Sequence, residues 1–148
     1  MKVGDISSRS VSFIGLNSSA RDAAWKMSEA QTGTLIVVPH REAKAIGILT
    51  DRDLVLKVLA KGASPEAVSV GDVMTRDVGT CRRDDDLFQA AQTMRRYGVR
   101  RLPVLDEKGL VVGLVTADDI HAALAAHMRE LGQALARERL HEIEALTQ

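Results

Sequence analysis

The amino-acid sequence predicts an α/β protein made of two copies of one β-α-β-β-α unit, followed by a C-terminal helix. Two observations predict this class: an internal duplication over most of the chain, and aliphatic strand-like runs that alternate with helical stretches in each copy. Strands that alternate with helices indicate sheets covered by helices. The composition agrees, because 45% of the 148 residues are hydrophobic and 27% are charged, as in folded globular domains.

The duplication is clearest in two nine-residue phrases, VGDISSRSV at 3–11 and VGDVMTRDV at 70–78, which share five identical positions at an offset of 67. The offset falls to 66 after the polar turns at 39–45 and 106–110, where length changes are tolerated. The repeat predicts three parts, namely a first domain, a second domain and a C-terminal amphipathic helix, at residues 1–66, 67–125 and 126–148.

In the first copy a strand near Phe13 precedes a helix predicted over residues 18–30. Two further strands are predicted over residues 34–38 and 45–49, and a second helix follows. Trp25 lies on the first helix, where core packing is the default expectation for a large aromatic residue.

The second copy follows the same plan. Asp84 is the predicted N-cap of a helix whose apolar residues recur at helical spacing, and Gly98 lies where a helix C-terminus favours a left-handed residue. The aliphatic runs LPVL and LVVGLV, separated by the turn residues 106–109, predict an antiparallel hairpin.

The segment from residue 126 to residue 148 has no counterpart in the first copy. Its apolar residues fall at helical spacing among Arg and Glu: Met128, Leu131, Leu135, Ile143 and Leu146. The segment either folds back onto its own core or forms a dimerising arm, and the sequence favours neither.

Composition and cysteine usage exclude several functions. Lys plus Arg equals Asp plus Glu at 20 each, and aromatic residues make up 3%, which argues against a nucleic-acid partner. Cys81 is a single cysteine and the four histidines have no metal-ligand spacing, so we expect no metal site. No apolar run approaches the roughly 20 residues of a membrane span. We therefore expect a cytoplasmic protein that does not contact a membrane, and we see no catalytic triad or phosphate-binding loop that indicates an enzyme.

One phrase occurs twice: GILTDRDL at 47–54 and GLVTADDI at 113–120. Thr-x-x-Asp before a helix is the spacing of a capping box, so helix capping alone is one interpretation. The other is a nucleotide site, because a Thr hydroxyl can bond a phosphate, an Asp carboxylate can accept both hydroxyls of a ribose, and Arg52 adds a fork suited to phosphate.

Together with VMTRDV and YGVRRLPVLDEKGLVVG, the doubled phrase makes the sequence resemble a tandem pair of CBS domains, also called a Bateman module, over residues 1 to about 125. The resemblance implies two units packed about a pseudo-twofold axis with two clefts between them. It further implies a non-catalytic sensor that needs no cofactor and binds an adenosyl ligand such as AMP, ADP, ATP, NAD or S-adenosylmethionine. Family members commonly form flat dimers and regulate a partner, so a homodimer and an unidentified regulated protein are expected.

By the same resemblance, Asp53 and Asp119 hold the ribose, and Thr50 and Thr116 contact the phosphate or ribose. Thr80, which we expect at the end of the first strand of the second copy, also touches the ligand. The adenine pocket is then lined by five consecutive residues: Val99, Arg100, Arg101, Leu102 and Pro103. Arg100 and Arg101 are either a phosphate clamp or solvated side chains.

The two copies also differ from each other. Ile36 stands where the second copy has Pro103, and Asp118 stands where the first copy has Arg52. A carboxylate disfavours a phosphate, so the two clefts should not bind one ligand equally. The alternative function is a structural or protein-interaction module with degenerate clefts.

Overall fold

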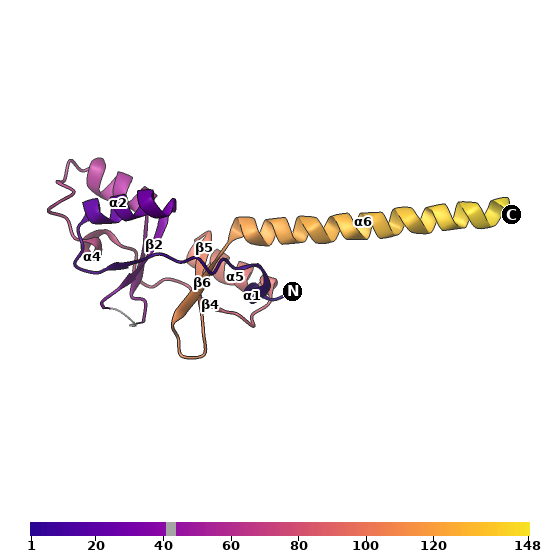
Figure 1. Cartoon of the computed structure of the whole chain (residues 1–148), viewed down its shortest axis with the longest axis horizontal. Helices are drawn as coiled ribbons and strands as arrows, with labels where there is room; N and C mark the ends of the chain where they lie inside the picture. Colours follow the sequence, from indigo (N-terminus) through magenta and orange to yellow (C-terminus); the bar gives the residue numbers. More distant parts are fainter. Residues whose placement is uncertain (41–43) are drawn as a thin grey trace.

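The structure is a computed structural model that describes residues 1–40 and 44–148. It has two lobes and one long helix that projects from the second lobe (Figure 1). Each lobe contains a three-stranded sheet and helices, so the predicted α/β class and doubled β-α-β-β-α plan are confirmed. Residues 41–43 of the expected turn at 39–45 lie outside the described residues.

The first lobe is built on three strands, which are in sheet order β1 (Phe13–Gly15), β2 (Thr34–Val38) and β3 (Gly47–Thr50). β1 pairs parallel with β2, and β2 pairs antiparallel with β3. Helix α2 (Ala20–Ala30) connects the parallel pair. After β3 the chain enters α3 (Asp51–Leu54), which continues as a π-helical turn, η1 (Val55–Leu59).

The second lobe repeats this arrangement, with strands β4 (Cys81–Arg82), β5 (Arg101–Leu105) and β6 (Val111–Thr116). Helix α5 (Leu87–Tyr97) connects the parallel pair β4 and β5, and α6 (Ala117–Thr147) follows β6. β5 and β6 pair antiparallel, so the predicted hairpin is confirmed.

The helix ends of α5 are set by its buried face. Leu87, Ala90 and Met94 face the core, so the helix begins after Asp86, whose carboxylate accepts a hydrogen bond from the Gln89 amide at 2.8 Å. The predicted N-cap at Asp84 is therefore wrong, because the residue three positions on is apolar and cannot complete a capping box. At the other end Gly98 has φ 65°, as predicted for a left-handed C-cap.

Trp25 contradicts the expectation of core packing, because 66% of its surface is exposed. The buried residues of α2 are Ala20, Ala23 and Met27, and Trp25 lies on the opposite side of the helix.

The two copies exchange their first segments. Helix α1 (Val3–Ile6) precedes the first lobe in sequence, but Val3 is fully buried in the core of the second lobe. Helix α4 (Val70–Val73) precedes the second lobe and packs in the core of the first. The sequence units expected at 1–66 and 67–125 are thus tied together by segments that cross between the lobes.

Glycines at the start of β3 and within β6 allow this crossing. A Cβ on Gly47 would lie 2.8 Å from the Thr75 carbonyl oxygen, and one on Gly113 would lie 2.8 Å from that of Ser8. Thr75 pairs with Ile48 of β3, and Ser8 pairs with Leu114 of β6, each through two backbone hydrogen bonds. The Thr75 amide, for example, donates to the Ile48 carbonyl at 2.9 Å. The glycine of the doubled phrase therefore serves close backbone approach.

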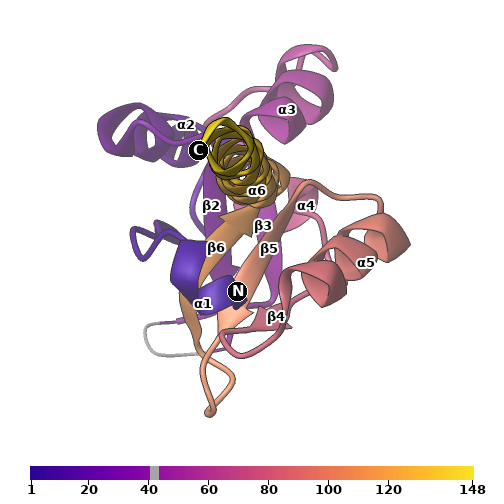
Figure 2. The ribbon, with the colours of Figure 1, turned by 90° about the vertical axis from the view of Figure 1, so that its right-hand side faces the viewer.

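Helix α6 runs without a break from Ala117 through Gly132 to Thr147, so the helix expected to start at 126 continues from the second lobe. Every residue from 127 to 148 is exposed, and the helix extends away from both lobes (Figure 1), so that it is seen end-on in Figure 2. The alternative in which this segment folds back onto its own core is wrong.

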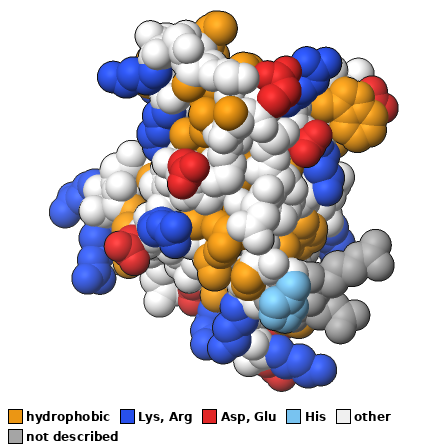
Figure 3. All heavy atoms as spheres, turned by 90° about the vertical axis from the view of Figure 1, so that its left-hand side faces the viewer, with side chains coloured by type: hydrophobic (Ala, Val, Ile, Leu, Met, Phe, Trp, Pro, Cys, Tyr) orange, Lys and Arg blue, Asp and Glu red, His pale blue; other side chains and the backbone are white. Residues whose placement is uncertain are grey.

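The opposite end of the molecule has no such projection. On that face Lys, Arg, Asp and Glu side chains are interspersed with small hydrophobic patches (Figure 3). This distribution agrees with the balanced overall charge of the chain.

Candidate functional site

Both Thr-x-x-Asp sequences form capping boxes. The Thr50 hydroxyl accepts from the Asp53 amide at 3.2 Å, and the Thr50 amide donates to Asp53 Oδ2 at 3.0 Å. The corresponding distances for Thr116 and Asp119 are 3.1 and 2.8 Å. Helix capping is therefore part of what the doubled phrase does, in both copies.

The capping geometry limits what each threonine can offer a ligand. The hydroxyl proton of Thr50 points to Asp53 Oδ2 at 3.1 Å, and that of Thr116 to Asp119 Oδ2 at 2.8 Å. A hydroxyl has one proton and two lone pairs, and the capped amide already uses one lone pair. Each threonine can accept a bond from a ribose hydroxyl as it stands, but it can donate to a phosphate only if the contact with Asp breaks.

The two aspartates differ in their second oxygen. Asp53 Oδ1 lies 3.0 Å from the Lys57 ammonium, which also donates to the Val73 carbonyl at 3.0 Å. The residue that corresponds to Lys57 in the second copy is Ala123. Within the described chain no hydrogen bond or ion pair reaches Oδ1 of Asp119, so only this carboxylate keeps an uncommitted oxygen.

A cleft of about 410 Å³ lies between the lobes, a volume within the range of small-molecule sites. Strand β3 and the start of α3 form one wall, residues 75–78 form the second, and residues 97–101 after α5 form the third. The cleft brings together five of the predicted site residues: Thr50, Arg52, Val99, Arg100 and Arg101.

The other predicted site residues lie elsewhere. Asp53 takes part in the capping box of α3 and does not line the cleft, and Leu102 and Pro103 are buried in β5. Thr80 is exposed and precedes β4, whereas the expectation placed it at the end of that strand. Thr116 and Asp119 begin α6 in the other lobe and do not line this cleft.

The sequence reasoning missed the wall at residues 75–78, together with Ile48, Asp51 and Tyr97. A signal was present, because TRDV is the end of the nine-residue repeat and its equivalence to SRSV marked it as more than a linker. What the sequence did not reveal is that this segment pairs with β3.

The cleft lining is positively charged. It holds four arginines, Arg52, Arg76, Arg100 and Arg101, against the two carboxylates of Asp51 and Asp77, a balance of 4 − 2 = +2. Arg100 also forms an exposed ion pair with Asp118 at 3.0 Å. Two neighbouring arginines, Arg95 and Arg96, are exposed in the last turn of α5 and do not line this cleft.

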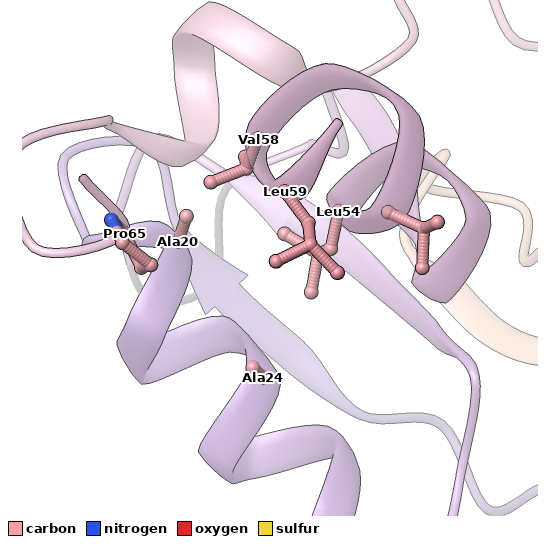
Figure 4. A pocket seen from close by; sticks show the side chains of 7 residues that line it. Ala20, Ala24, Leu54, Val58, Leu59 and Pro65 are labelled. Carbon is pink, nitrogen blue, oxygen red and sulfur yellow. The ribbon is translucent and has the colours of Figure 1, made fainter. Parts of the chain in front are cut away.

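Two further hollows are apolar. One, of about 190 Å³, lies between α2 and the α3–η1 helix and is lined by Ala, Val, Leu and Pro side chains, including Leu54 and Leu59 (Figure 4). It offers no charged or hydrogen-bonding side chain, so it does not resemble a nucleotide site. The other lies at the base of α6, where α5 and α6 meet.

Cys81 is buried, with 4% of its surface exposed. Burial and the nearby Asp85 carboxylate raise the pKa of its thiol to about 12. Among the residues that the structure describes, no group of three or more His, Cys, Asp or Glu side chains is arranged to hold a metal ion. In the same part of the chain no helix is long and apolar enough to cross a membrane.

Comparison with known proteins identifies the family. Residues 3–60 and 70–126 each match the CBS domain. The chain belongs to the CBS domain family. The two matched regions coincide with the two lobes apart from their exchanged first segments.

The structure of the CBS domain pair of protein MJ0100, in complex with 5′-methylthioadenosine and S-adenosyl-L-methionine, is 29% identical in sequence. It has a TM-score of 0.74 and covers 86% of this chain and 98% of its own. MK0525 of Methanopyrus kandleri is 36% identical over 120 residues, which is 81% of this chain and 61% of that protein. The chain therefore spans less than two thirds of this relative.

Some relatives are named as enzymes, but the match covers a small part of them. A homoserine O-acetyltransferase of Methanococcus vannielii is 35% identical over 118 residues, which is 80% of this chain and 24% of that enzyme. The similarity is thus to a CBS region carried by the enzyme. The chain is a CBS domain pair, and such pairs are in general regulatory and non-catalytic modules.

Proposed function

We propose that this protein is a sensor that binds a phosphorylated adenosine nucleotide in the cleft between its lobes. The observation that carries the proposal is the arginine-rich lining of that cleft beside Thr50. Guanidinium groups recognise phosphate in a bidentate manner, and four arginines are among the residues that line this volume.

The charge of the lining selects among adenosyl ligands. AMP, ADP, ATP and NAD carry phosphates and are anionic, whereas S-adenosylmethionine carries a sulfonium cation. A lining with a balance of +2 favours the phosphorylated ligands. The CBS pair of MJ0100 binds S-adenosylmethionine and 5′-methylthioadenosine, which supports an adenosyl ligand here but not the same one.

The ribose fits the hydrogen-bonding capacity that remains. The free lone pair of the Thr50 hydroxyl can accept from a ribose hydroxyl without disturbing the cap. Oδ1 of Asp53 already accepts from the Lys57 ammonium at 3.0 Å, so a ribose hydroxyl that donates to this oxygen has to share it with Lys57. Ligand binding therefore competes with one partly exposed ion pair.

The regulatory effect must arise because the ligand binds one arrangement of the molecule more tightly than another. Since walls of the cleft come from both lobes and from the crossing segment, a ligand there favours one relative position of the lobes. We propose that the readout is a separate regulated protein in the cytoplasm, and that the sensor acts as a homodimer.

A second function, an interaction module without a small-molecule ligand, is favoured by a specific observation. Both Thr-x-x-Asp motifs already satisfy helix ends, and both oxygens of Asp53 have a partner, Oδ2 in the cap and Oδ1 at Lys57. In this alternative the motifs are caps and nothing more.

Thermal unfolding and calorimetry with AMP, ADP, ATP, NAD and S-adenosylmethionine distinguish the two. A ligand at 100 times its dissociation constant stabilises the fold by about 2.7 kcal/mol, a shift in melting temperature of roughly 5 °C or more. We expect a phosphorylated ligand to do this, and Arg101→Gln to weaken its binding at least tenfold. Arg129→Gln, an equally exposed arginine on α6, is the matched control and should leave binding unchanged. If none of the five ligands shifts the melting temperature, the sensor proposal is wrong.

A further inference from the structure

Tyr97 gives the cleft beside Thr50 an aromatic wall. It is the last residue of α5, and among the residues that the structure describes it is the one aromatic side chain that lines this cleft. Aromatic residues make up only 3% of the sequence, and 46% of the surface of Tyr97 is exposed. Bases stack on aromatic side chains of this kind in nucleic-acid sites, so a ring in the wall of a nucleotide cleft is a candidate for contact with the base.

Gly79 makes room for this ring. A Cβ on Gly79 would lie 2.6 Å from Cδ2 of Tyr97 and 2.9 Å from Cγ, which is closer than a side chain can approach a ring. The glycine therefore allows the ring to pack directly against the backbone of the segment that precedes β4.

The first copy has neither the ring nor the glycine. At the offset of 67, Ala30 corresponds to Tyr97 and Ser12 corresponds to Gly79. The gain of a large side chain in the second copy thus coincides with the loss of a side chain at its contact. Of the two rings of this contact's neighbourhood that the repeat could supply, only the one at Tyr97 exists, so the aromatic wall belongs to the cleft beside Thr50.

The strands differ in the same place. In the first copy the Ile36 amide donates to the Ser12 carbonyl at 2.9 Å, which ties the segment before β1 to β2. Pro103 stands at the equivalent position of β5 and has no amide proton. The corresponding bond to Gly79 cannot form, so this bond does not hold Gly79 against β5, and Gly79 packs against Tyr97.

Two contacts hold the ring in place and leave part of it uncovered. The guanidinium carbon of Arg96 lies over the ring, 5.9 Å from its centroid. Gly79 packs against the side of the ring that carries Cδ2. Neither Arg96 nor Gly79 lines the cleft, so both support the ring from outside it. A ring that is already held loses little conformational entropy when a ligand binds to it.

We propose that Tyr97 is the residue of this cleft that recognises the base, and that a purine stacks on its ring while the arginines of the lining bind the phosphate. The inference rests on the proposed nucleotide site and adds the group that contacts the base. Leu102 and Pro103, which the family resemblance assigns to the adenine pocket, are buried in β5 and do not line the cleft.

Stacking determines which ligands bind well. Every base has a π-face, but the two fused rings of a purine cover more of an aromatic side chain than the single ring of a pyrimidine. Tyr97 should therefore favour AMP and GMP over UMP, and it should not by itself distinguish adenine from guanine.

Calorimetric titration with AMP, UMP and ribose 5-phosphate tests the stacking. Ribose 5-phosphate keeps the sugar and the phosphate of AMP but has no base. From the usual contribution of base stacking, we expect AMP to bind the wild-type protein between about fivefold and a hundredfold more tightly than ribose 5-phosphate. UMP should fall between the two.

Three variants assign the effect to the ring. Tyr97→Leu should lower the affinity for AMP to that for ribose 5-phosphate and leave the affinity for ribose 5-phosphate unchanged. Tyr97→Phe keeps the ring and should stay within about twofold of the wild type for both ligands. Phe88→Leu is the matched control, because Phe88 lies on the same helix, is 71% exposed and does not line the cleft.

Each other result overturns the proposal in a distinct way. An equal loss of AMP and ribose 5-phosphate in Tyr97→Leu would mean that the ring only shapes the cleft. A loss in Tyr97→Phe as large as in Tyr97→Leu would assign the effect to the hydroxyl, and UMP that binds as tightly as AMP would refute the purine preference. If AMP binds the wild type and Tyr97→Leu equally, the nucleotide site stands without this base contact. If neither AMP nor ribose 5-phosphate binds the wild type, the nucleotide site is wrong and base recognition with it.

Discussion

Removal of the Thr50 hydroxyl tests what the doubled phrase contributes to the fold. Thr50→Ala deletes an acceptor for the Asp53 amide at 3.2 Å and a donor to Asp53 Oδ2 at 3.1 Å. Replacing an N-cap threonine with alanine costs about 0.5–2 kcal/mol. Thr50 and Asp53 are half-buried, so water replaces the lost bonds only in part, and we expect about 1–1.5 kcal/mol.

Urea denaturation followed by circular dichroism measures this loss as a lower midpoint at an unchanged slope. Thr50→Ser is the matched control, because serine keeps the hydroxyl and should cost only a few tenths of a kcal/mol by capping criteria. If Thr50→Ser destabilises the protein as much as Thr50→Ala, the contribution comes from the methyl group and the capping argument is refuted. Titration of Thr50→Ala with the nucleotide then separates helix capping from ligand binding. If the motif is only a cap, the wild-type protein shows no response to the nucleotide, and the substitution cannot weaken one.

Three further outcomes follow from burial and backbone contacts. Cys81, whose pKa is raised to about 12, should react with a thiol reagent at pH 8 only after the protein unfolds. The pKa of this thiol is higher in the folded than in the unfolded protein, so the free energy of unfolding should fall as the pH rises from about 9 to about 12. Trp25→Ala should change the free energy of unfolding by less than about 0.5 kcal/mol, whereas Leu35→Ala, at a fully buried position, should cost about 2–5 kcal/mol in the same urea assay. Gly47→Ala should cost about 1–3 kcal/mol and disturb the cleft, detected by calorimetric titration, because its Cβ would meet the crossing segment at Thr75.

The sequence predicted the elements of the fold because each carries a local signal. The β5–β6 hairpin has a turn with Asp and Gly between aliphatic runs, and Gly98 ends α5 at φ 65°. The error at Trp25 was avoidable, since Ala20, Ala23 and Met27 already define the buried face by their spacing. The error at Asp84 arose because three aspartates, residues 84–86, stand in a row. Only Asp86 has a polar residue, Gln89, three positions later that can complete a capping box.

The sequence did not predict features that depend on contacts between distant segments. The exchange of α1 and α4 between lobes and the pairing of Thr75 with β3 connect residues that no local pattern relates. As a result, five of the thirteen residues that line the cleft were expected, and the wall at residues 75–78 was not. The pairing of Lys57 with Asp53, by contrast, has the i, i+4 spacing of a helical ion pair and was readable from the sequence.

The difference between the two copies bears on the cleft beside Thr50 and on the second Thr-x-x-Asp motif at once. Asp118 replaces Arg52 in the second motif and, by its charge, disfavours a phosphate beside Thr116. The same carboxylate pairs at 3.0 Å with Arg100, which lines the cleft beside Thr50. A phosphate that binds Arg100 therefore competes with Asp118. Because the two side chains are 74% and 85% exposed, the pair contributes less than about 1 kcal/mol, so this competition changes ligand affinity by no more than about fivefold. Since the competition is weak, the arginine-rich cleft stays available to a phosphate. The presence of Asp118 in place of an arginine therefore lowers phosphate affinity mainly at the second motif, beside Thr116.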